Sequence, residues 1–310
     1  MAPQRGRTAG ATPPAAPSGE QIEISFEDQQ AVVTEVGAGL RNYSAGGRDL
    51  LDGYSPDQLA QSGRGQLLIP WPNRIRDGIY ELDGRRHQLP LNEPERNNAI
   101  HGLVRWSSWS ISERSAGRVV LEHVLRPQPG YPFSLALGVE YSLSPDGLAV
   151  RTEATNVGAE ACPYGAGAHP YLAVGAGGVD EAVLRVPARA VLEADERGIP
   201  VGSGPVEGSE LDFRKPRPIG RARLDHCFTY LDRDEDGWAR VELDGTTLWA
   251  DESYPYLMIF TGDGLPDADR RSVAVEPMTC APNAFSSGDG LILLEPGGSH
   301  AAAWGIAITS

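Results

Sequence analysis

Cysteine and long hydrophobic runs are both scarce in this sequence. Only three of its 310 residues are cysteines, and Cys162, Cys227 and Cys280 include no C-x-x-C pair. Such spacing supplies neither a disulfide framework nor a zinc-binding pattern, and it is typical of a reducing compartment. No apolar segment approaches the roughly 20 residues that a membrane-spanning helix needs. Because the N-terminal stretch also lacks the apolar core of a secretory signal, we expect a cytoplasmic protein.

Basic residues are also few compared with acidic ones. Lys and Arg total 27 against 42 Asp and Glu, which gives a formal net charge of −15. An acidic surface repels the phosphates of nucleic acids and anionic membranes, so we expect neither as a partner. The sequence has no glycine-rich phosphate loop, dinucleotide-binding motif or lysine cluster. These absences favour a neutral substrate over a phosphorylated one.

Long amphipathic helices are missing too, whereas turn-forming residues are abundant. The chain has 37 glycines and 25 prolines, and Asp-Gly pairs at 83–84, 146–147 and 244–245 each separate two strand-like segments. Such pairs are strong hairpin signals. At most, residues 56–61 form one or two helical turns. We therefore predict an all-β protein built as a large antiparallel β-sandwich. The expected strands include residues 22–26, 31–36, 80–82, 119–125, 256–260, 273–276, 291–294 and 302–308.

The first 20 residues differ in composition from the rest. They are rich in Ala, Pro, Gly and Ser, which predicts a disordered tail. After residue 20 there is no linker and no repeat of fixed period. We therefore expect residues 21–310 to form a single domain.

Two segments in the first third of the chain carry polar side chains suited to binding sugar hydroxyls or a carboxylate. Asn73 and Arg74 follow a Trp-Pro pair in an irregular stretch, and a guanidinium can donate to two oxygens at once. His101 follows an asparagine-rich run. Taken singly, Arg74 is better explained by a structural salt bridge, and His101 by a hydrogen-bonded loop.

A third segment, CPYGAGAHPYLAV, carries His169 between small residues and a proline. This setting predicts a tight backbone that directs one side chain into a concavity. An imidazole there can give or take a proton near neutral pH. Tyr171 is then placed either to pack on the apolar face of a sugar ring or to lie in the core.

Two later segments add carboxylates. In RLDHCFTYLD, Asp225 and His226 are adjacent, and only one of the two can face a given pocket if the segment is a strand. In VAVEPMTCAPNAF, Glu276 stands at the end of an apolar strand, just before a proline. Such a carboxylate is either an exposed charge at a strand end or a partly desolvated base with a raised pKa.

Together these segments resemble the aldose 1-epimerase (galactose mutarotase) family. The resemblance runs from about residue 20 to the C-terminus, and its main pieces are PWPNRI, the run ending in His101-Gly102, AHPY, VEPMTCAPNAF and the closing LLEPGGSHAAAWGIAI. No single piece is decisive, but their shared order makes coincidence a poor explanation. The sequence departs from the family at one place. Leu103-Val104-Arg105 follows His101-Gly102, where the family often has a second glycine.

The resemblance implies a galactose mutarotase-like supersandwich with the sugar on its concave face and with neither cofactor nor metal. It implies an isomerase that interconverts the α and β anomers of a free aldose. His169 is then the general acid and Glu276 the general base. The positions that match family residues binding sugar hydroxyls are Arg74, His101 and Asp225. Asn73 and Tyr171 are added as substrate-binding neighbours from their sequence context.

Several alternatives remain open at this level. Arg74, Arg76 and Arg105 could clamp the phosphate of a hexose 6-phosphate. A non-catalytic sugar-binding sandwich would keep the pocket without turnover. A glycoside hydrolase could use Asp225 with Glu276, but His169 would then lack a role. The histidines lack helical ligand spacing, so no metal site is expected. A small aldose is the expected partner, and the protein is expected to be a monomer or a weak homodimer.

Overall fold

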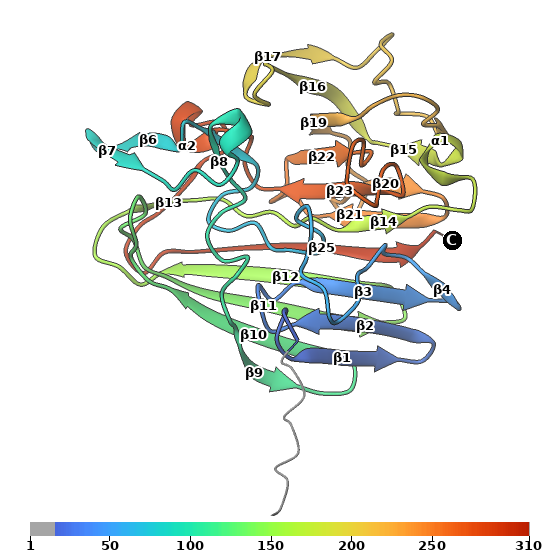
Figure 1. Ribbon diagram of the computed structural model, residues 1–310, viewed down its shortest axis with the longest axis horizontal. Coiled ribbons are helices and arrows are strands. Elements are labelled where there is room, and N and C mark those ends of the chain that lie inside the picture. Colours follow the sequence, from blue (N-terminus) through green and yellow to red (C-terminus); the bar gives the residue numbers. More distant parts are fainter. Residues whose placement is uncertain (1–15, 310) are drawn as a thin grey trace, which may run out of the picture.

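A computed structural model describes residues 16–309, whose regular secondary structure is almost entirely antiparallel strand. The three largest sheets have four, nine and six strands (Figure 1). One large hydrophobic cluster runs through all three of them. The predicted all-β class, with its large antiparallel sheets, is confirmed. None of the helices within residues 16–309 is long and apolar enough to span a bilayer.

The four-stranded sheet lies at the N-terminal end of the described chain. Its strands follow one another in sequence order and are β1 (Gln21–Phe26), β2 (Gln29–Thr34), β3 (Leu40–Ala45) and β4 (Arg48–Asp49). The predicted tail reaches into this region. Residues 1–15 lie outside the described part, but Ser18 is buried and its carbonyl accepts a hydrogen bond from the Val36 amide at 3.0 Å. Ser18 is therefore packed on the domain, although the predicted tail extends to residue 20.

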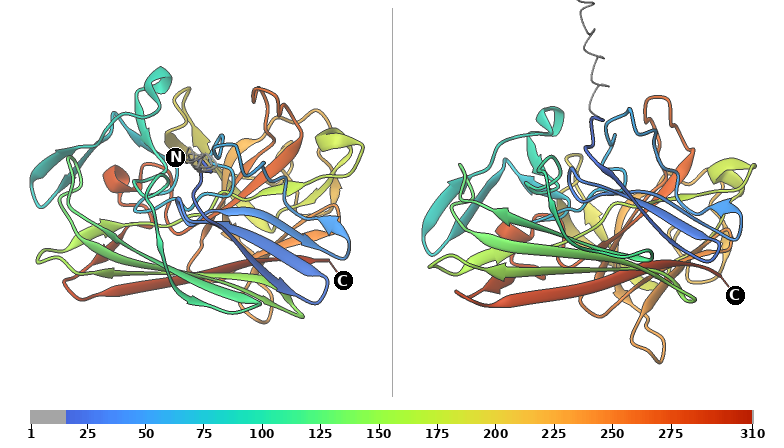
Figure 2. Two further views of the ribbon diagram at one scale, coloured as in Figure 1. Left: turned by 60° about the horizontal axis from the view of Figure 1, so that its bottom comes forward. Right: turned by 90° about the horizontal axis from the view of Figure 1, so that it is seen from below.

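The nine-stranded sheet forms a broad curved layer (Figures 1 and 2). Its spatial order is β18-β15-β20-β21-β25-β12-β11-β10-β9. The bounds are β9 (Ser110–Arg114), β10 (Arg118–Leu125), β11 (Leu135–Ser144), β12 (Gly147–Asn156), β15 (Val183–Arg185), β18 (Arg217–Pro218), β20 (Ala239–Leu243), β21 (Thr246–Ala250) and β25 (Ser299–Ile308). Buried and partly exposed residues alternate along β11, because one face of the strand meets the core.

The six-stranded sheet, in the upper part of Figure 1, has the order β14-β23-β22-β19-β16-β17. The bounds are β14 (Tyr171–Ala173), β16 (Ala188–Ala194), β17 (Pro200–Pro205), β19 (Asp225–Leu231), β22 (Tyr256–Phe260) and β23 (Ser272–Met278). Every residue of β23 is buried. Glu276 is therefore an interior residue of this strand. The alternative of an exposed charge at a strand end is wrong.

Short elements complete the fold. Three two-stranded sheets join β5 (Arg74–Arg76) to β8 (Asn98–Ile100), β6 (Ile79–Leu82) to β7 (Arg85–Gln88), and β13 (Cys162–Tyr164) to β24 (Ile292–Leu294). The helices are α1 (Gly178–Glu181), α2 (Ala284–Ser287) and a 3₁₀ turn at Pro94–Arg96.

Local turn chemistry predicted the hairpins well and the helix poorly. The Asp-Gly pairs connect β6 to β7, β11 to β12 and β20 to β21, as expected. The possible helix at residues 56–61 is wrong, because the segment makes only a turn in which the Gln58 amide donates to the Ser55 carbonyl. A helix this short has little cooperative stability of its own.

Candidate active site

A cavity of about 660 Å³ opens in front of the six-stranded sheet. The strand register explains which side chains form its floor. Glu276 of β23 pairs with Met258 of β22, and Asp225 of β19 pairs with Phe260 of β22. Paired residues point to the same face, as do residues two positions apart, so all four side chains share one face. Segments between β5 and β8 and before β14 supply the walls.

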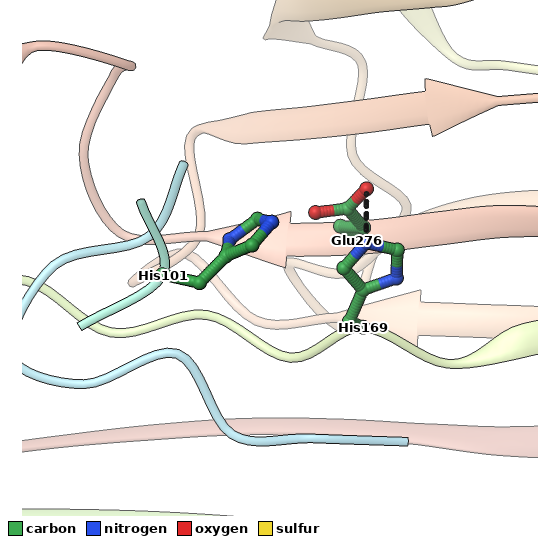
Figure 3. A group of neighbouring side chains, drawn as sticks. All are labelled: His101, His169 and Glu276. Atoms are coloured by element: carbon green, nitrogen blue, oxygen red, sulfur yellow. Dashed lines mark ion pairs between the residues drawn. The ribbon is translucent and has the colours of Figure 1, made fainter. Parts of the chain in front are cut away.

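His169 and Glu276 lie side by side in this cavity (Figure 3). The His169 Nε2 atom is 3.3 Å from Glu276 Oε1, and the two residues are only 5% and 2% exposed. The backbone holds His169 in place, since its amide donates to the Gln66 carbonyl at 3.0 Å and its carbonyl accepts from the Gly65 amide at 2.9 Å. The remaining polar atoms of the pair, His169 Nδ1 and Glu276 Oε2, have no partner among the described residues.

Burial shifts both pKa values of this pair toward the neutral forms. Desolvation, followed by the charge of Arg105, lowers the pKa of His169 to about 3. Desolvation and the nearby Asp225 raise the pKa of Glu276 well above its usual range, against a smaller opposing effect of Arg74. A neutral imidazole beside a protonated carboxyl shares one transferable proton, which then resides on the carboxyl. The same proton count describes an imidazolium beside a carboxylate, so transfer within the pair creates an acid and a base without proton uptake.

His101 faces His169, with its ring nearly perpendicular at 74° and the ring centroids 5.3 Å apart. The Asn73 amide donates to His101 Nδ1 at 3.2 Å, and the His101 amide donates to the Asn73 carbonyl at 2.9 Å. Burial lowers the pKa of His101 well below its usual range, so the ring is neutral. Because Nδ1 accepts a hydrogen bond, the proton is on Nε2, and this N–H is available to donate to a ligand oxygen.

Arg74 is held in the cavity wall by a carboxylate that the sequence did not single out. Its Nε and a terminal nitrogen donate to Glu93 at distances of 2.9–3.1 Å, and Asn98 donates to the same carboxylate at 2.8 Å. All three residues are buried. Glu93 lies in a polar loop beside the 3₁₀ turn, where neither periodicity nor spacing marks it. The predicted salt bridge of Arg74 and its predicted place at the site are both observed.

Tyr171 borders the cavity but is only 1% exposed. Its ring stacks on His169 with centroids 5.0 Å apart and planes inclined by 12°, and the Arg64 guanidinium lies 4.0 Å from the ring centroid. Its hydroxyl donates to the Ser62 carbonyl at 3.0 Å. Of the two expected settings for Tyr171, this arrangement matches the core and not the packing on a sugar ring. The ring positions His169 and leaves little of its own surface for a ligand.

Asp225 and His226 both border the cavity. Asp225 shares the face of Glu276, as described above. His226 turns back over the start of β19, because its Nδ1 accepts a hydrogen bond from the Asp225 amide at 3.1 Å. The expectation that only one of the two would reach the pocket is therefore wrong. The local hydrogen bond overrides strict alternation at the strand end.

Gly63 contacts the acid–base pair without contributing a side chain. A Cβ atom at this position would lie 2.5 Å from His169 Cδ2, and the glycine has a φ of +77°. Neither the close approach nor the backbone angle suits another residue. The loop around Gly63 thus packs its bare backbone against the imidazole.

The structure brings together all seven residues that the sequence nominated. The cavity lining includes Asn73, Arg74, His101, His169, Tyr171, Asp225 and Glu276. Ligand atoms of His101, His169 and Glu276 also lie within 4.8 Å of one another, so the trio has the donor types of a metal site. The sequence analysis expected no metal site, because the three residues come from separate segments and have no helical spacing.

Comparisons with known proteins give the same picture. A family model described as aldose 1-epimerase matches residues 20–306. The chain is 38% identical over 289 residues to the uncharacterized protein YihR of Escherichia coli K12, with 91% of both chains covered. It is 30% identical over 211 residues to galactose mutarotase of Rattus norvegicus, which covers 62% of this chain and 60% of the rat protein.

Solved structures share the fold at lower sequence identity. An aldose epimerase homologue from Caenorhabditis elegans superimposes with a TM-score of 0.83 at 18% identity and covers 94% of this chain and 99% of its own. A galactose 1-epimerase from Lactobacillus acidophilus NCFM gives a TM-score of 0.79 at 22% identity, covering 94% and 95%. The family model spans nearly the whole chain, and the chain therefore belongs to the aldose 1-epimerase family.

Proposed function

We propose that the protein interconverts the α and β anomers of a free aldose by opening and reclosing the sugar ring. The observation that carries this proposal is the buried pair of His169 and Glu276, 3.3 Å apart at the floor of a sugar-sized cavity. General acid–base catalysis requires positioned groups that exchange protons with the substrate. Family membership supports the same class of reaction.

The reaction follows from the positions of two protons. Glu276, as the carboxylate, removes the proton of the C1 hydroxyl while His169, as the imidazolium, protonates the ring oxygen. The bond between C1 and the ring oxygen then breaks and leaves an open-chain aldehyde. Rotation about C1–C2 presents the other face of the carbonyl. Ring closure reverses both proton transfers, so the pair returns to its starting state.

The neighbouring groups are suited to holding the sugar during this exchange. The His101 Nε2–H and the Arg74 guanidinium are donors for hydroxyl oxygens, and the Asp225 carboxylate is an acceptor. Arg74 keeps its orientation because two of its guanidinium nitrogens donate to the Glu93 carboxylate. The fixed donors can position C1 and the ring oxygen against the acid–base pair.

The other readings have less support. Arg76 pairs with Asp195 at 2.7 Å and does not border the cavity, so a phosphate clamp of Arg74, Arg76 and Arg105 lacks one of its members. A glycoside hydrolase needs two carboxylates across the scissile bond, whereas the closest partner of Glu276 is an imidazole. A non-catalytic sugar-binding protein would not need an acid–base pair.

Polarimetry tests the proposal directly. Freshly dissolved α-glucose and α-galactose should reach anomeric equilibrium faster with the protein than in buffer alone, and their acidic C6 derivatives should be tested in parallel. Glu276→Gln is the matched control, because it keeps the size of the side chain and removes its basicity. If the folded protein accelerated none of these sugars, the proposed activity would be wrong.

A further inference from the structure

Four arginines border the sugar cavity, and their partners differ. Three of them face a carboxylate: Arg74 lies 2.9 Å from Glu93, Arg96 lies 3.9 Å from Asp225, and Arg223 lies 3.5 Å from Asp263. The fourth is Arg105. Among residues 16–309 it has no carboxylate oxygen within 4.0 Å, the distance at which the other three are paired.

The contacts that Arg105 does make are weak. One terminal nitrogen lies 3.4 Å from Gln66 Oε1 and another 3.4 Å from the Ile100 carbonyl, and the guanidinium is 5.9 Å from the centroid of the Trp106 ring. The side chain is partly buried, and this desolvation lowers the pKa of the guanidinium. A partly buried charge without a counter-charge is costly. An anionic ligand group would offset that cost.

The location of Arg105 indicates which part of a sugar would meet it. Its guanidinium lies against the Ile100 carbonyl, one residue before His101, and against the side chain of Gln66, whose carbonyl accepts from the His169 amide. Arg105 therefore lines the cavity on the side of His169, the imidazole assigned to protonate the ring oxygen. In an aldopyranose the ring oxygen is bonded to C5, and C5 carries C6. A substituent on C6 is therefore the exocyclic group that lies next to His169 on the side away from the C1 hydroxyl.

The charge balance also limits the ligand. Only one cavity arginine is unpaired, while the exposed Glu95 at the rim and the net charge of −15 both oppose a second negative charge. A singly charged group, such as a carboxylate or a sulfate, matches one guanidinium better than a phosphate dianion does. Arg105 also belongs to the Leu103-Val104-Arg105 segment, where the sequence departs from its family after His101-Gly102.

We propose that the substrate is an acidic aldose with a singly charged oxyanion on C6, and that Arg105 binds this group. The proposal rests on the function proposed above and replaces the expectation of a neutral sugar. It makes Arg105 a specificity-determining residue, whereas His169 and Glu276 exchange protons with any aldose that fits.

Kinetics with matched sugars test the preference. Glucose, glucuronate, glucose 6-sulfate and glucose 6-phosphate differ at C6 but share the same C1 chemistry. We expect kcat/KM for glucuronate, glucose 6-sulfate or both to exceed that for glucose by on the order of ten- to a hundredfold, the usual strength of a charge-assisted hydrogen bond. The better of the two identifies the anion as a carboxylate or a sulfate. A higher value for glucose, or for glucose 6-phosphate, would overturn the proposal.

Variants separate Arg105 from a general charge effect. Arg105→Gln should reduce the acidic-to-neutral ratio of kcat/KM to near one, and Arg105→Lys should retain part of it. Arg85→Gln is the control, because it removes the same charge from an exposed pair with Glu160. Retention of the full ratio in Arg105→Gln would refute the assignment.

Calorimetric binding of the same sugars keeps this test independent of turnover. The wild-type protein should bind an acidic sugar at least tenfold more tightly than glucose, and Arg105→Gln should lose that difference. Failure of turnover with this binding preference intact would count against the proposed activity alone. Equal binding of acidic and neutral sugars would count against the role of Arg105 alone.

Discussion

Two inner strands, β11 of the nine-stranded sheet and β23 of the six-stranded sheet, differ in how they are buried. Buried and partly exposed residues alternate along β11, whereas all seven residues of β23 are buried. One face of β11 meets the core and the other approaches solvent. β23 is covered on both faces, and it still carries a glutamate. The comparison separates a strand that contributes stability from one that also contributes chemistry.

The largest expected effect is that of replacing Glu276 on β23 or its partner His169. Glu276→Gln and His169→Asn should each lower kcat by about a hundredfold to ten-thousandfold, because both keep size and remove proton exchange. The two groups act in one exchange, so the double variant should be little slower than the slower single variant. Initial rates from polarimetry measure this.

Stability should respond differently to these changes. Glu276→Gln should leave the free energy of unfolding within about 1 kcal/mol of wild type, since a carboxyl with a raised pKa is already held in its neutral form. Near-normal turnover in this variant would mean that another carboxylate is the base, and Asp225, which also borders the cavity, would be tested next.

Substitutions in the core face of β11 should show the opposite behaviour, with a loss of stability and no loss of turnover. Leu135→Ala in β11 removes a fully buried side chain and should lower the free energy of unfolding by about 2–5 kcal/mol. The kcat per folded molecule should stay the same. Ser142→Ala, on the other face of β11, is the control and should change stability by less than about 0.5 kcal/mol. Urea unfolding measures both, and a large loss of kcat in Leu135→Ala would break the comparison.

The buried Arg74–Glu93 pair tests whether ligand binding depends on a side chain outside the predicted set. Glu93→Gln leaves the guanidinium without its carboxylate, so we expect KM to rise by on the order of tenfold with a smaller change in kcat. Glu160→Gln, which breaks an exposed ion pair, serves as the control. An unchanged KM in Glu93→Gln would show that Arg74 does not need this partner.

The loss of stability in acid should depend more on His101 at the site than on a histidine of the outer strands. His101 has a pKa well below 6.5 in the folded protein, so below pH 6.5 the unfolded chain binds a proton that the folded chain does not. The free energy of unfolding should therefore decrease as the pH is lowered below 6.5, by at most about 1.4 kcal/mol per pH unit for this group. The opposite pKa shifts of His169 and Glu276 offset one another only above about pH 4.5, because below it the unfolded chain also binds the glutamate proton. His101→Asn should flatten the profile more than His123→Asn, because His123 on β10 is only half-buried.

The smallest expected effect is that of chelation. Proton transfer by His169 and Glu276 requires no Lewis acid, so EDTA treatment should leave kcat within about twofold of the untreated value. The cluster of His101, His169 and Glu276 makes this measurement informative. Loss of activity on chelation and its recovery with zinc would show that the trio holds a metal.

Local chemistry accounts for most of what the sequence could predict. Asp-Gly turns and alternating strands depend on neighbouring residues, so they identified the hairpins and the fold class. Pieces of the site were also found, because small residues and prolines mark irregular backbone around His169. The partners of these residues were not found. Glu93 and Arg64 act on Arg74 and Tyr171 through contacts that only the folded chain creates, and Arg105 stands out only once its neighbours are shown to be paired.

The bare backbone at Gly63 has a consequence for how this protein can evolve. Any side chain there would push against His169, so the structure leaves little room for a substitution at residue 63, although none of its own atoms takes part in the proposed chemistry. Changes in substrate preference are therefore easier at Arg105, which is only partly buried, than at residue 63. Saturation mutagenesis of the two positions should find many tolerated residues at 105 and almost none at 63. Drift in specificity and conservation of the reaction would then be encoded in separate stretches of the chain.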